Sequence, residues 1–228
     1  MIARKDKFLT GMILMILFAG VFVAIFMPLF NGQNGLEYLD NLYNSISKGS
    51  AYYIDSVRSE VETVEGSEIT LNLTMKSEVQ AQQTVPLFMK AGAQVGHDGA
   101  QLTVTGNMIR ILGHCLDDAQ LMYDNDGAAV AGKYGYAEKA VLYNWWSALK
   151  AMDFDLKRQK KFKLSKMAEL VNKKAVETAY NYYGIEGQKI SDRIGVVIFS
   201  LIFYVVYTLW YGFGIMYLFE GWGMRLEH

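Results

Sequence analysis

Two long apolar runs, residues 8–30 and residues 194–219, frame a middle stretch in which apolar and polar residues alternate with shorter periods. Neither run contains Asp, Glu, Lys, Arg or His. An α-helix rises about 1.5 Å per residue, so each run is long enough to cross a hydrocarbon core of about 30 Å. The pattern therefore predicts two transmembrane helices, one towards each end of the chain.

A cleavable signal peptide is the alternative interpretation of the first run. The apolar part of a signal peptide is shorter, about 7–15 residues, and a cleavage site with small residues follows it. Residues 8–30 form a longer run, which ends in the bulky sequence Met27-Pro28-Leu29-Phe30. We therefore interpret the run as an uncleaved membrane anchor.

The charges beside the first run predict the orientation. Residues 1–7 hold Arg4, Lys5 and Lys7, and no Lys or Arg follows the run until Lys48. Positively charged flanks stay in the cytoplasm, so the N-terminal tail is expected there.

Two spans return the chain to the starting side of a membrane. Residues 220–228 then form a short cytoplasmic tail, and residues 31–193 form one extracytoplasmic domain, periplasmic in a bacterial-type inner (plasma) membrane. Residues 226–228, Leu-Glu-His, are typical of the start of an appended purification tag.

The middle domain begins with a helical pattern and continues as a small sheet. Residues 36–62 predict one or two helices, with a break at Lys48-Gly49-Ser50. Residues 68–75 alternate between apolar and polar, which indicates a half-buried strand. Asp98-Gly99 between two short alternating runs predicts a hairpin, and Asn107 is suited to cap the helix after it.

A helix is expected between the first strand and the hairpin. Ser77 and Gln80 have capping-box spacing, but Pro86 interrupts the pattern. The helix is therefore either kinked at Pro86 or begins near Val85 with Thr84 as its cap. Residues 68–123 then have the order β-α-β-β-α.

Residues 137–183 contain neither Gly nor Pro and are mostly strong helix formers. Two apolar stripes favour a long helix that bends or breaks between Phe154 and Ser165, although one helix and two helices remain alternatives. The expected fold is an integral membrane α+β protein: two terminal transmembrane helices, a three-stranded sheet and long helices.

Composition changes this picture little and excludes several kinds of chemistry. The 228 residues are 52% hydrophobic, and their net charge of −1 gives no indication of nucleic-acid binding. With one cysteine, Cys115, no intramolecular disulfide forms. Neither a nucleophile elbow, a P-loop, an HExxH motif nor a Gly-rich dinucleotide motif is present. We therefore expect a protein that is not an enzyme and has no cofactor.

Asp117, Asp118, Asp124 and Asp126 are the candidate metal ligands. Their carboxylates suit calcium or another hard cation, and Asp124-Asn125-Asp126-Gly127 resembles part of a calcium loop. The rest of that pattern is missing, because Met122 and Lys133 occupy two ligand positions. A helix end followed by a solvated loop is the alternative interpretation.

The spans carry two features that suit contact with other helices. Gly20 and Ala24 form a small-xxx-small pair, which allows close helix approach. Hydroxyl groups share one face of the second span, and in lipid they need hydrogen-bonding partners. This stripe comprises Ser200, Tyr204, Tyr207 and Tyr211. It is expected to pack against the first span or, alternatively, to form a subunit interface or line a pore.

The lack of charge in the spans argues against active transport, since pumps and proton relays use ionisable groups in the membrane. The first functional hypothesis is a homo-oligomeric membrane assembly, with a passive channel or pore as one form of it. Exposed sheet edges that pair between subunits would support such an assembly. An accessory or scaffolding subunit of a larger membrane complex is the alternative, and a ligand sensor without an output domain is the third. The expected partners are the lipid bilayer and other copies or other membrane subunits.

Overall fold

The computed structural model describes residues 2–63 and 68–224. Arg225 and the tag-like residues 226–228 lie outside the described residues. The elements, in order, are α1 (Lys5–Ile25), α2 (Gly35–Ser50), α3 (Ile54–Glu62), β1 (Glu68–Thr74), α4 (Glu78–Lys90), β2 (Gln94–Asp98), β3 (Gln101–Asn107), α5 (Met108–Tyr123), α6 (Gly127–Tyr134), α7 (Glu138–Arg158), α8 (Phe162–Val171), the π-helix η1 (Asn172–Val176), α9 (Glu177–Tyr182) and α10 (Ile190–Trp222).

The mixed α+β class, the three-stranded sheet and the β-α-β-β-α order are confirmed. The chain divides into two compact units, which we call the helical unit (Met1–Ser50 with Gly187–His228) and the α+β unit (Ala51–Glu186). The sequence instead suggested a single domain over residues 31–193. The difference arises because Leu42 and Ile46 of α2 pack against Val197 of α10.

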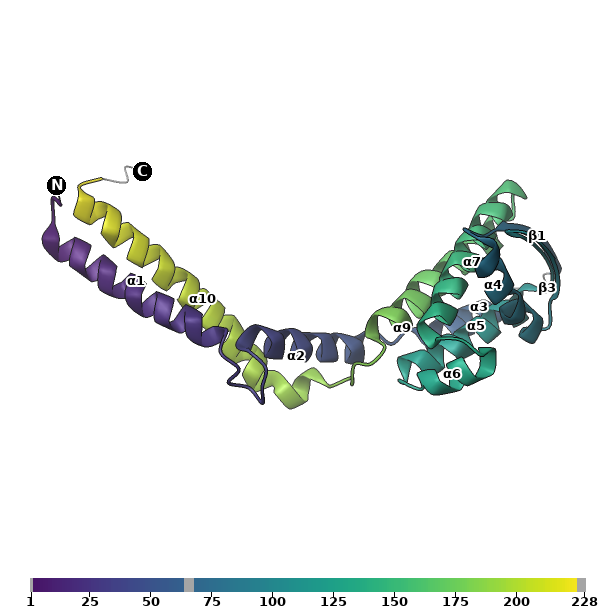
Figure 1. Cartoon of the computed structure of the whole chain (residues 1–228), viewed down its shortest axis with the longest axis horizontal. Helices are drawn as coiled ribbons and strands as arrows, with labels where there is room; N and C mark the ends of the chain where they lie inside the picture. Colours follow the sequence, from purple (N-terminus) through teal and green to yellow (C-terminus); the bar gives the residue numbers. More distant parts are fainter. Residues whose placement is uncertain (1, 64–67, 225–228) are drawn as a thin grey trace. The chain divides into compact units, whose positions relative to one another are not determined.

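α1 and α10 lie side by side (Figure 1), and both are long and apolar enough to cross a membrane. The first span was expected to reach Phe30, but α1 ends at Ile25. Pro28 accounts for this, because a proline disfavours helical backbone at the residue before it. α10 is longer than the expected run 194–219 at both ends.

The expected helix break at Lys48-Gly49-Ser50 is wrong. α2 continues through these residues, and the break lies at residues 51–53. Gly49 serves a close contact instead, since a Cβ atom there would lie 2.5 Å from the carbonyl oxygen of Gln188.

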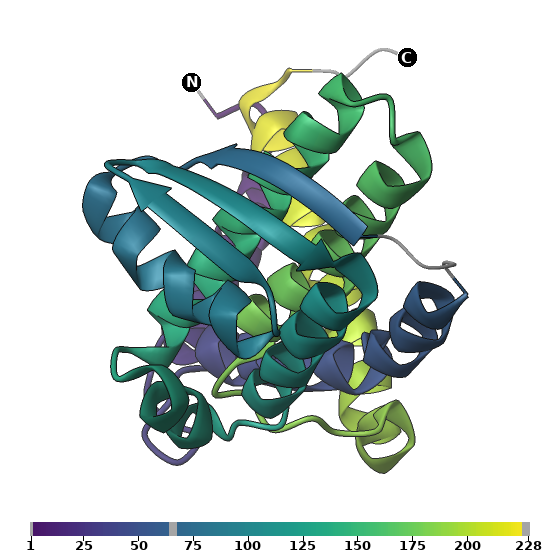
Figure 2. The same cartoon turned by 90° about the vertical axis from the view of Figure 1, so that its right-hand side faces the viewer.

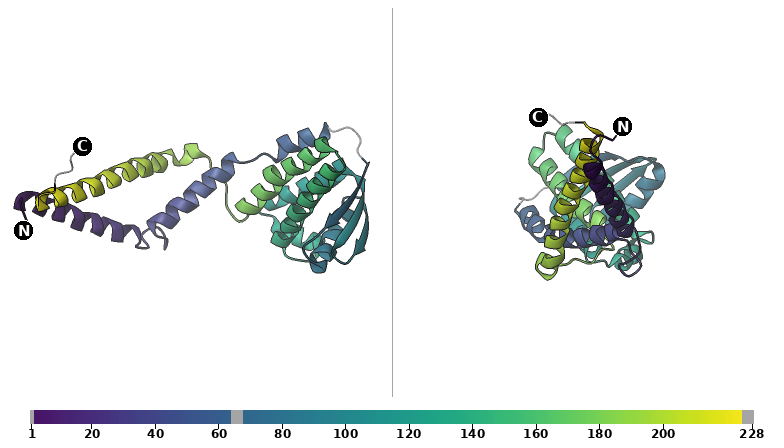
Figure 3. Two further views of the ribbon diagram at one scale, coloured as in Figure 1. Left: turned by 90° about the horizontal axis from the view of Figure 1, so that it is seen from above. Right: turned by 90° about the vertical axis from the view of Figure 1, so that its left-hand side faces the viewer.

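The sheet has the strand order β1-β3-β2, and both pairings are antiparallel. Figure 2 shows the three strands side by side, and in Figure 3 the helices of the α+β unit lie on one side of them only. Alternate residues of β1 are buried, as the period of two in its sequence predicts. Polar side chains, among them Thr70 and Thr105, cover the other face.

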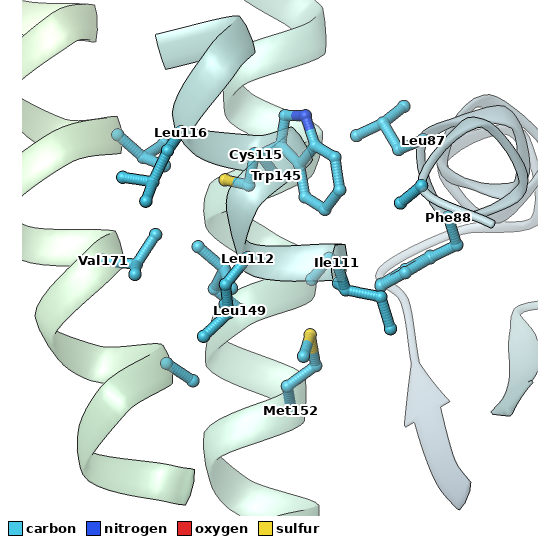
Figure 4. Packing of buried hydrophobic residues seen from close by; sticks show 14 of the residues in the cluster. Leu87, Phe88, Ile111, Leu112, Cys115, Leu116, Trp145, Leu149, Met152 and Val171 are labelled. Carbon is cyan, nitrogen blue, oxygen red and sulfur yellow. The ribbon is translucent and has the colours of Figure 1, made fainter. Parts of the chain in front are cut away.

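The helices under the sheet enclose the core of the α+β unit. Trp145 of α7 lies between Cys115 of α5 and Leu87 of α4 (Figure 4), and it is fully buried. Ser77 caps α4 by accepting a hydrogen bond from the Gln80 backbone, so the alternative start near Val85 is wrong; Pro86 lies inside the helix.

The segment 137–183 forms separate helices rather than one rod. The break between α7 and α8 falls at residues 159–161, where Lys160 has a φ of 59°, and this lies inside the expected window. Asn107 caps α5 as predicted. Ser165 lies inside α8, and its hydroxyl donates to Asp153 at 2.6 Å.

Candidate functional site

Glycines bring α1 and α10 into close contact. A Cβ atom on Gly11 would lie 2.7 Å from the backbone nitrogen of Leu218, and one on Gly221 would lie 2.6 Å from the backbone of Phe8. Gly214 meets the side chain of Met15 in the same way, at 2.8 Å. These three glycines therefore let the two backbones approach as small residues do in membrane helix pairs.

The predicted small-residue pair lies elsewhere on α1. No atom lies within 4 Å of a Cβ atom built on Gly20, and the residue is exposed. Ala24 is half-buried. Gly20 thus takes no part in the contact with α10, and its use by a helix of another copy stays a prediction.

The hydroxyl stripe of α10 is divided between several contacts. Tyr207 stacks on Phe18 of α1 with ring centroids 4.3 Å apart, and Tyr211 lies 5.2 Å from the same ring. The hydroxyl of Ser200 lies 2.7 Å from that of Tyr43 in α2. Tyr204 is 69% exposed. Most of the stripe therefore packs within the helical unit, and Tyr204 faces outward.

The four candidate metal ligands have separate protein partners. Among the described residues, His, Cys, Asp and Glu form no group of three or more that could hold a metal ion. The partners are Arg58 for Asp117, Gln120 for Asp124, and the Ala129 backbone N–H for Asp126, which caps α6. Asp118 points the other way, into the core.

Asp118 is the centre of a buried polar cluster. Its side chain is fully buried, and its Oδ1 accepts from Lys133 at 2.8 Å. Its Oδ2 accepts from the Tyr134 hydroxyl at 2.5 Å and from the indole N–H of Trp145 at 2.8 Å. A buried carboxylate is tolerated only when it is paired and hydrogen-bonded, and these three donors meet that requirement. The cluster thereby links α5, α6 and α7.

His114 connects this cluster towards the surface. Its Nε2 lies 3.1 Å from the hydroxyl of Tyr134. Since that hydroxyl gives its hydrogen to Asp118, its oxygen accepts from Nε2–H of His114. Burial, followed by the charge of Lys133, lowers the pKa of His114. Burial and the hydrogen bond to Asp118 raise the pKa of Tyr134.

A pH-dependent stability follows from His114. In the unfolded chain the imidazole of His114 has a pKa of about 6.5, and in the folded protein its pKa is lower. The contribution of His114 to the free energy of unfolding is therefore fully present above about pH 6.5. It is lost as the pH falls towards the pKa of the folded protein, because the unfolded chain then binds the proton more readily. Thermal unfolding of the full chain in detergent should show a midpoint that falls between about pH 7.5 and about pH 5.5. His114→Gln, which keeps the donor to Tyr134, should reduce that fall; an unchanged slope would assign it to other groups.

A cavity of about 350 Å³ lies between α7 and α9. This volume falls within the range of about 300–1,000 Å³ that is usual for small-molecule pockets. The lining residues are Leu142, Tyr143, Trp146, Val176, Glu177, Tyr180 and Asn181. Rings, a carboxylate and an amide therefore share one surface, which suits an amphipathic molecule.

Charged groups hold the rings of this cavity in place. The indole N–H of Trp146 donates to Glu177 at 2.8 Å, and the ammonium of Lys150 lies 3.7 Å from its ring centroid. Lys76 donates to the hydroxyl of Tyr143 at 2.6 Å, and this hydrogen bond lowers the pKa of Tyr143. Trp146 and Glu177 are 31 residues apart in the sequence, so only the tertiary fold brings this carboxylate beside the ring.

No family model, curated protein or solved structure matches the chain.

Proposed function

We propose that this chain is a non-enzymatic integral membrane protein that works as a homo-oligomeric assembly. α1 and α10 cross the bilayer, and the α+β unit lies on the extracytoplasmic side of a bacterial-type inner membrane. The observation that carries the proposal is the surface of the two helices. Within α1 only Gly11 is buried, and within α10 only Val197, Gly214 and Gly221 are.

So large an apolar surface favours lipid and neighbouring helices over water. Soluble monomers rarely expose contiguous apolar patches larger than a few hundred Å². The surface includes Phe22, Phe199, Leu201 and Val206, all about half exposed or more. Their rings and aliphatic chains match the hydrocarbon core, which supports insertion of both helices.

The contacts between the start of α1 and the end of α10 support a location of both chain ends on the same side of the membrane. The backbone N–H groups of Ala3 and Arg4 both donate to the carbonyl oxygen of Gly221, at 2.9 and 3.0 Å. The start of α1 therefore lies beside the end of α10. Lys7 adds an ion pair with Glu220 at 3.7 Å. The basic residues at this end support a cytoplasmic location for it by the positive-inside rule.

Labelling of single cysteines tests the orientation. The native Cys115 is fully buried, and burial raises its thiol pKa, so it should not react in the folded protein. In intact cells, a membrane-impermeant maleimide should label Val79→Cys of α4, which is 63% exposed. It should label Ile2→Cys only after lysis. The reverse pattern would refute the proposed orientation.

Association of copies is supported by Tyr204. Its hydroxyl lies on an apolar helix, where a polar group needs a partner. The described part of the chain supplies no hydrogen bond to it, and the ring is 69% exposed. A helix of another copy can supply that bond, and so can water in a pore between copies.

Tyr204→Phe removes only the hydroxyl. Hydrogen bonds between membrane helices contribute roughly 0.6–2 kcal/mol, so the dissociation constant of the assembly should rise by about threefold to thirtyfold. Native mass spectrometry in detergent would measure the distribution of oligomers. Tyr217→Phe is the matched control, since the Tyr217 ring rather than its hydroxyl meets Lys7.

Three measurements separate the alternatives. A wild-type chain that stays monomeric at all concentrations would refute the homo-oligomer. Stoichiometric recovery of other membrane proteins would favour the accessory-subunit hypothesis. Ion flux into liposomes that hold the purified assembly tests the channel form of the proposal.

A further inference from the structure

The outer edge of β1 is closed by Asp155 of α7 and by Gln159, the residue that follows α7. The backbone N–H of Asn72 donates to Asp155 at 3.0 Å, and the carbonyl oxygen of Thr70 accepts from Gln159 at 2.8 Å. Both groups point away from β3, so they are the ones that an added strand would use. Side chains that occupy an edge in this way prevent pairing with another chain.

The backbone groups of Val95 and His97 form the outer edge of β2. Met75 donates to Ala100 at 2.8 Å, so the even-numbered residues of β3 bond to β1 and its odd-numbered residues face β2. Their partners in β2 are Gln94, Gly96 and Asp98. The backbone groups of Val95 and His97 therefore point outward.

This edge is open. No side chain in the described part of the chain bonds to the backbone of β2, in contrast to β1. Four of the five residues of β2 are exposed. A short edge with unpaired N–H and C=O groups is a template for strand addition.

We propose that β2 pairs with β2 of a second copy, antiparallel and about a two-fold axis at Gly96. The pairing makes one six-stranded sheet from two three-stranded ones. This inference rests on the proposed homo-oligomer, and it adds to that proposal an interface outside the membrane. An interface of this kind is isologous and closes as a dimer.

The sequence of β2 fits this register. Residues whose backbone groups point outward must oppose one another across the pairing. Val95 therefore pairs with His97 of the second copy, and His97 pairs with Val95 of the second copy. Each of these two pairs exchanges two backbone hydrogen bonds, which makes four in all. The register centred on Gly96 pairs all five residues, whereas centres on Val95 or His97 pair fewer. It also sets the Gln94 amide opposite the Asp98 carboxylate of the second copy, twice, and opposes no like charges.

Gly96 gives the register a direct reporter. In this register Gly96 opposes Gly96 of the second copy as a non-hydrogen-bonded pair. The Cα atoms of such a pair lie about 4.5 Å apart, which is within the range of about 4.4–6.8 Å that a disulfide bridges. A Cβ atom on Gly96 would meet Thr103 at 3.7 Å, an ordinary contact, so Gly96→Cys should fold. Mild oxidation in membranes should then cross-link Gly96→Cys into dimers, while the buried Cys115 stays unreactive.

Asn72→Cys is the matched control. Asn72 and Gly96 both pair with Thr103, so they occupy the same row of the same sheet face, one on each edge strand. Asn72→Cys should give only the slow cross-linking of random collision. Equal yields from the two variants would overturn the inference.

Charge at Gln94 tests the register without altering the strand. Gln94→Lys sets an ammonium opposite each Asp98 and should strengthen the dimer, by about fivefold in its association constant. Gln94→Asp sets like charges opposite each other and should weaken it by a similar factor. The two variants having equal effects would exclude this register.

The inference and the proposed function fail differently. Oligomers by native mass spectrometry, together with no excess of Gly96→Cys cross-linking over the control, would reject β2 pairing and leave the assembly standing. A monomeric wild-type chain would reject both.

Discussion

Asp118→Ala should lower the free energy of unfolding by about 3–5 kcal/mol, because it removes one partner of a buried ion pair. The carboxylate receives hydrogen bonds from Lys133, Tyr134 and Trp145. Without it, the fully buried indole N–H of Trp145 has no acceptor and cannot reach water. Urea unfolding of the full chain in detergent, followed by circular dichroism, would measure the loss.

The adjacent Asp117 provides the control. It also forms an ion pair, with Arg58 at 2.8 Å, but its side chain is 57% exposed. An exposed pair contributes about 0–1 kcal/mol, so Asp117→Ala should change stability little. If the two replacements had equal effects, the buried cluster would not stabilise the fold as described.

Sequence patterns predicted the elements of this protein well where the pattern is local. The alternation around Leu71 and the Asp98-Gly99 turn specify β1 and the hairpin without reference to the rest of the chain. Asn107 as a cap is another local signal, and it is confirmed. Local rules failed at Gly49, because a glycine also serves close approach of a distant segment, here Gln188.

The polar cluster could not be predicted in the same way. Asp118 was grouped with Asp117 and Asp124 because they are near one another in sequence. Neighbouring residues of a helix point in directions about 100° apart, so Asp117 faces solvent while Asp118 faces the core. Its donors come from α6 and α7, and only the tertiary fold brings them together. The period of the apolar residues around Leu116 and Ala119 was the available signal that position 118 faces inward.

The contact between α1 and α10 shows the same limit. Gly20 and Ala24 were selected for their spacing within one helix, but close packing needs a facing surface as well. Gly11 meets such a surface, formed by Gly214 and the backbone of Leu218, whereas Gly20 meets open space. Spacing within one helix therefore identifies small residues but not their partner.

Gly11→Ala should separate α1 from α10 at this contact. The added methyl group would lie 2.7 Å from the nitrogen of Leu218 and 3.0 Å from the oxygen of Gly214, which are backbone atoms that cannot rotate away. Overpacking of this kind costs about 1–3 kcal/mol, and we expect about 2 kcal/mol here. Gly20→Ala is the control, since its methyl group would contact nothing, and it should leave the helix pair unchanged.

The distance between the ends of the helix pair reports on this change. Dyes on Ile2→Cys and Met224→Cys should lie close together in the folded protein, because Ala3 is hydrogen-bonded to Gly221. Energy transfer between them, followed during an SDS titration, gives the midpoint at which α1 leaves α10. A lower midpoint for Gly11→Ala than for Gly20→Ala is the expected result. Equal midpoints would mean that the glycine contact does not hold the pair together, and that the stack of Phe18 on Tyr207 carries the association instead.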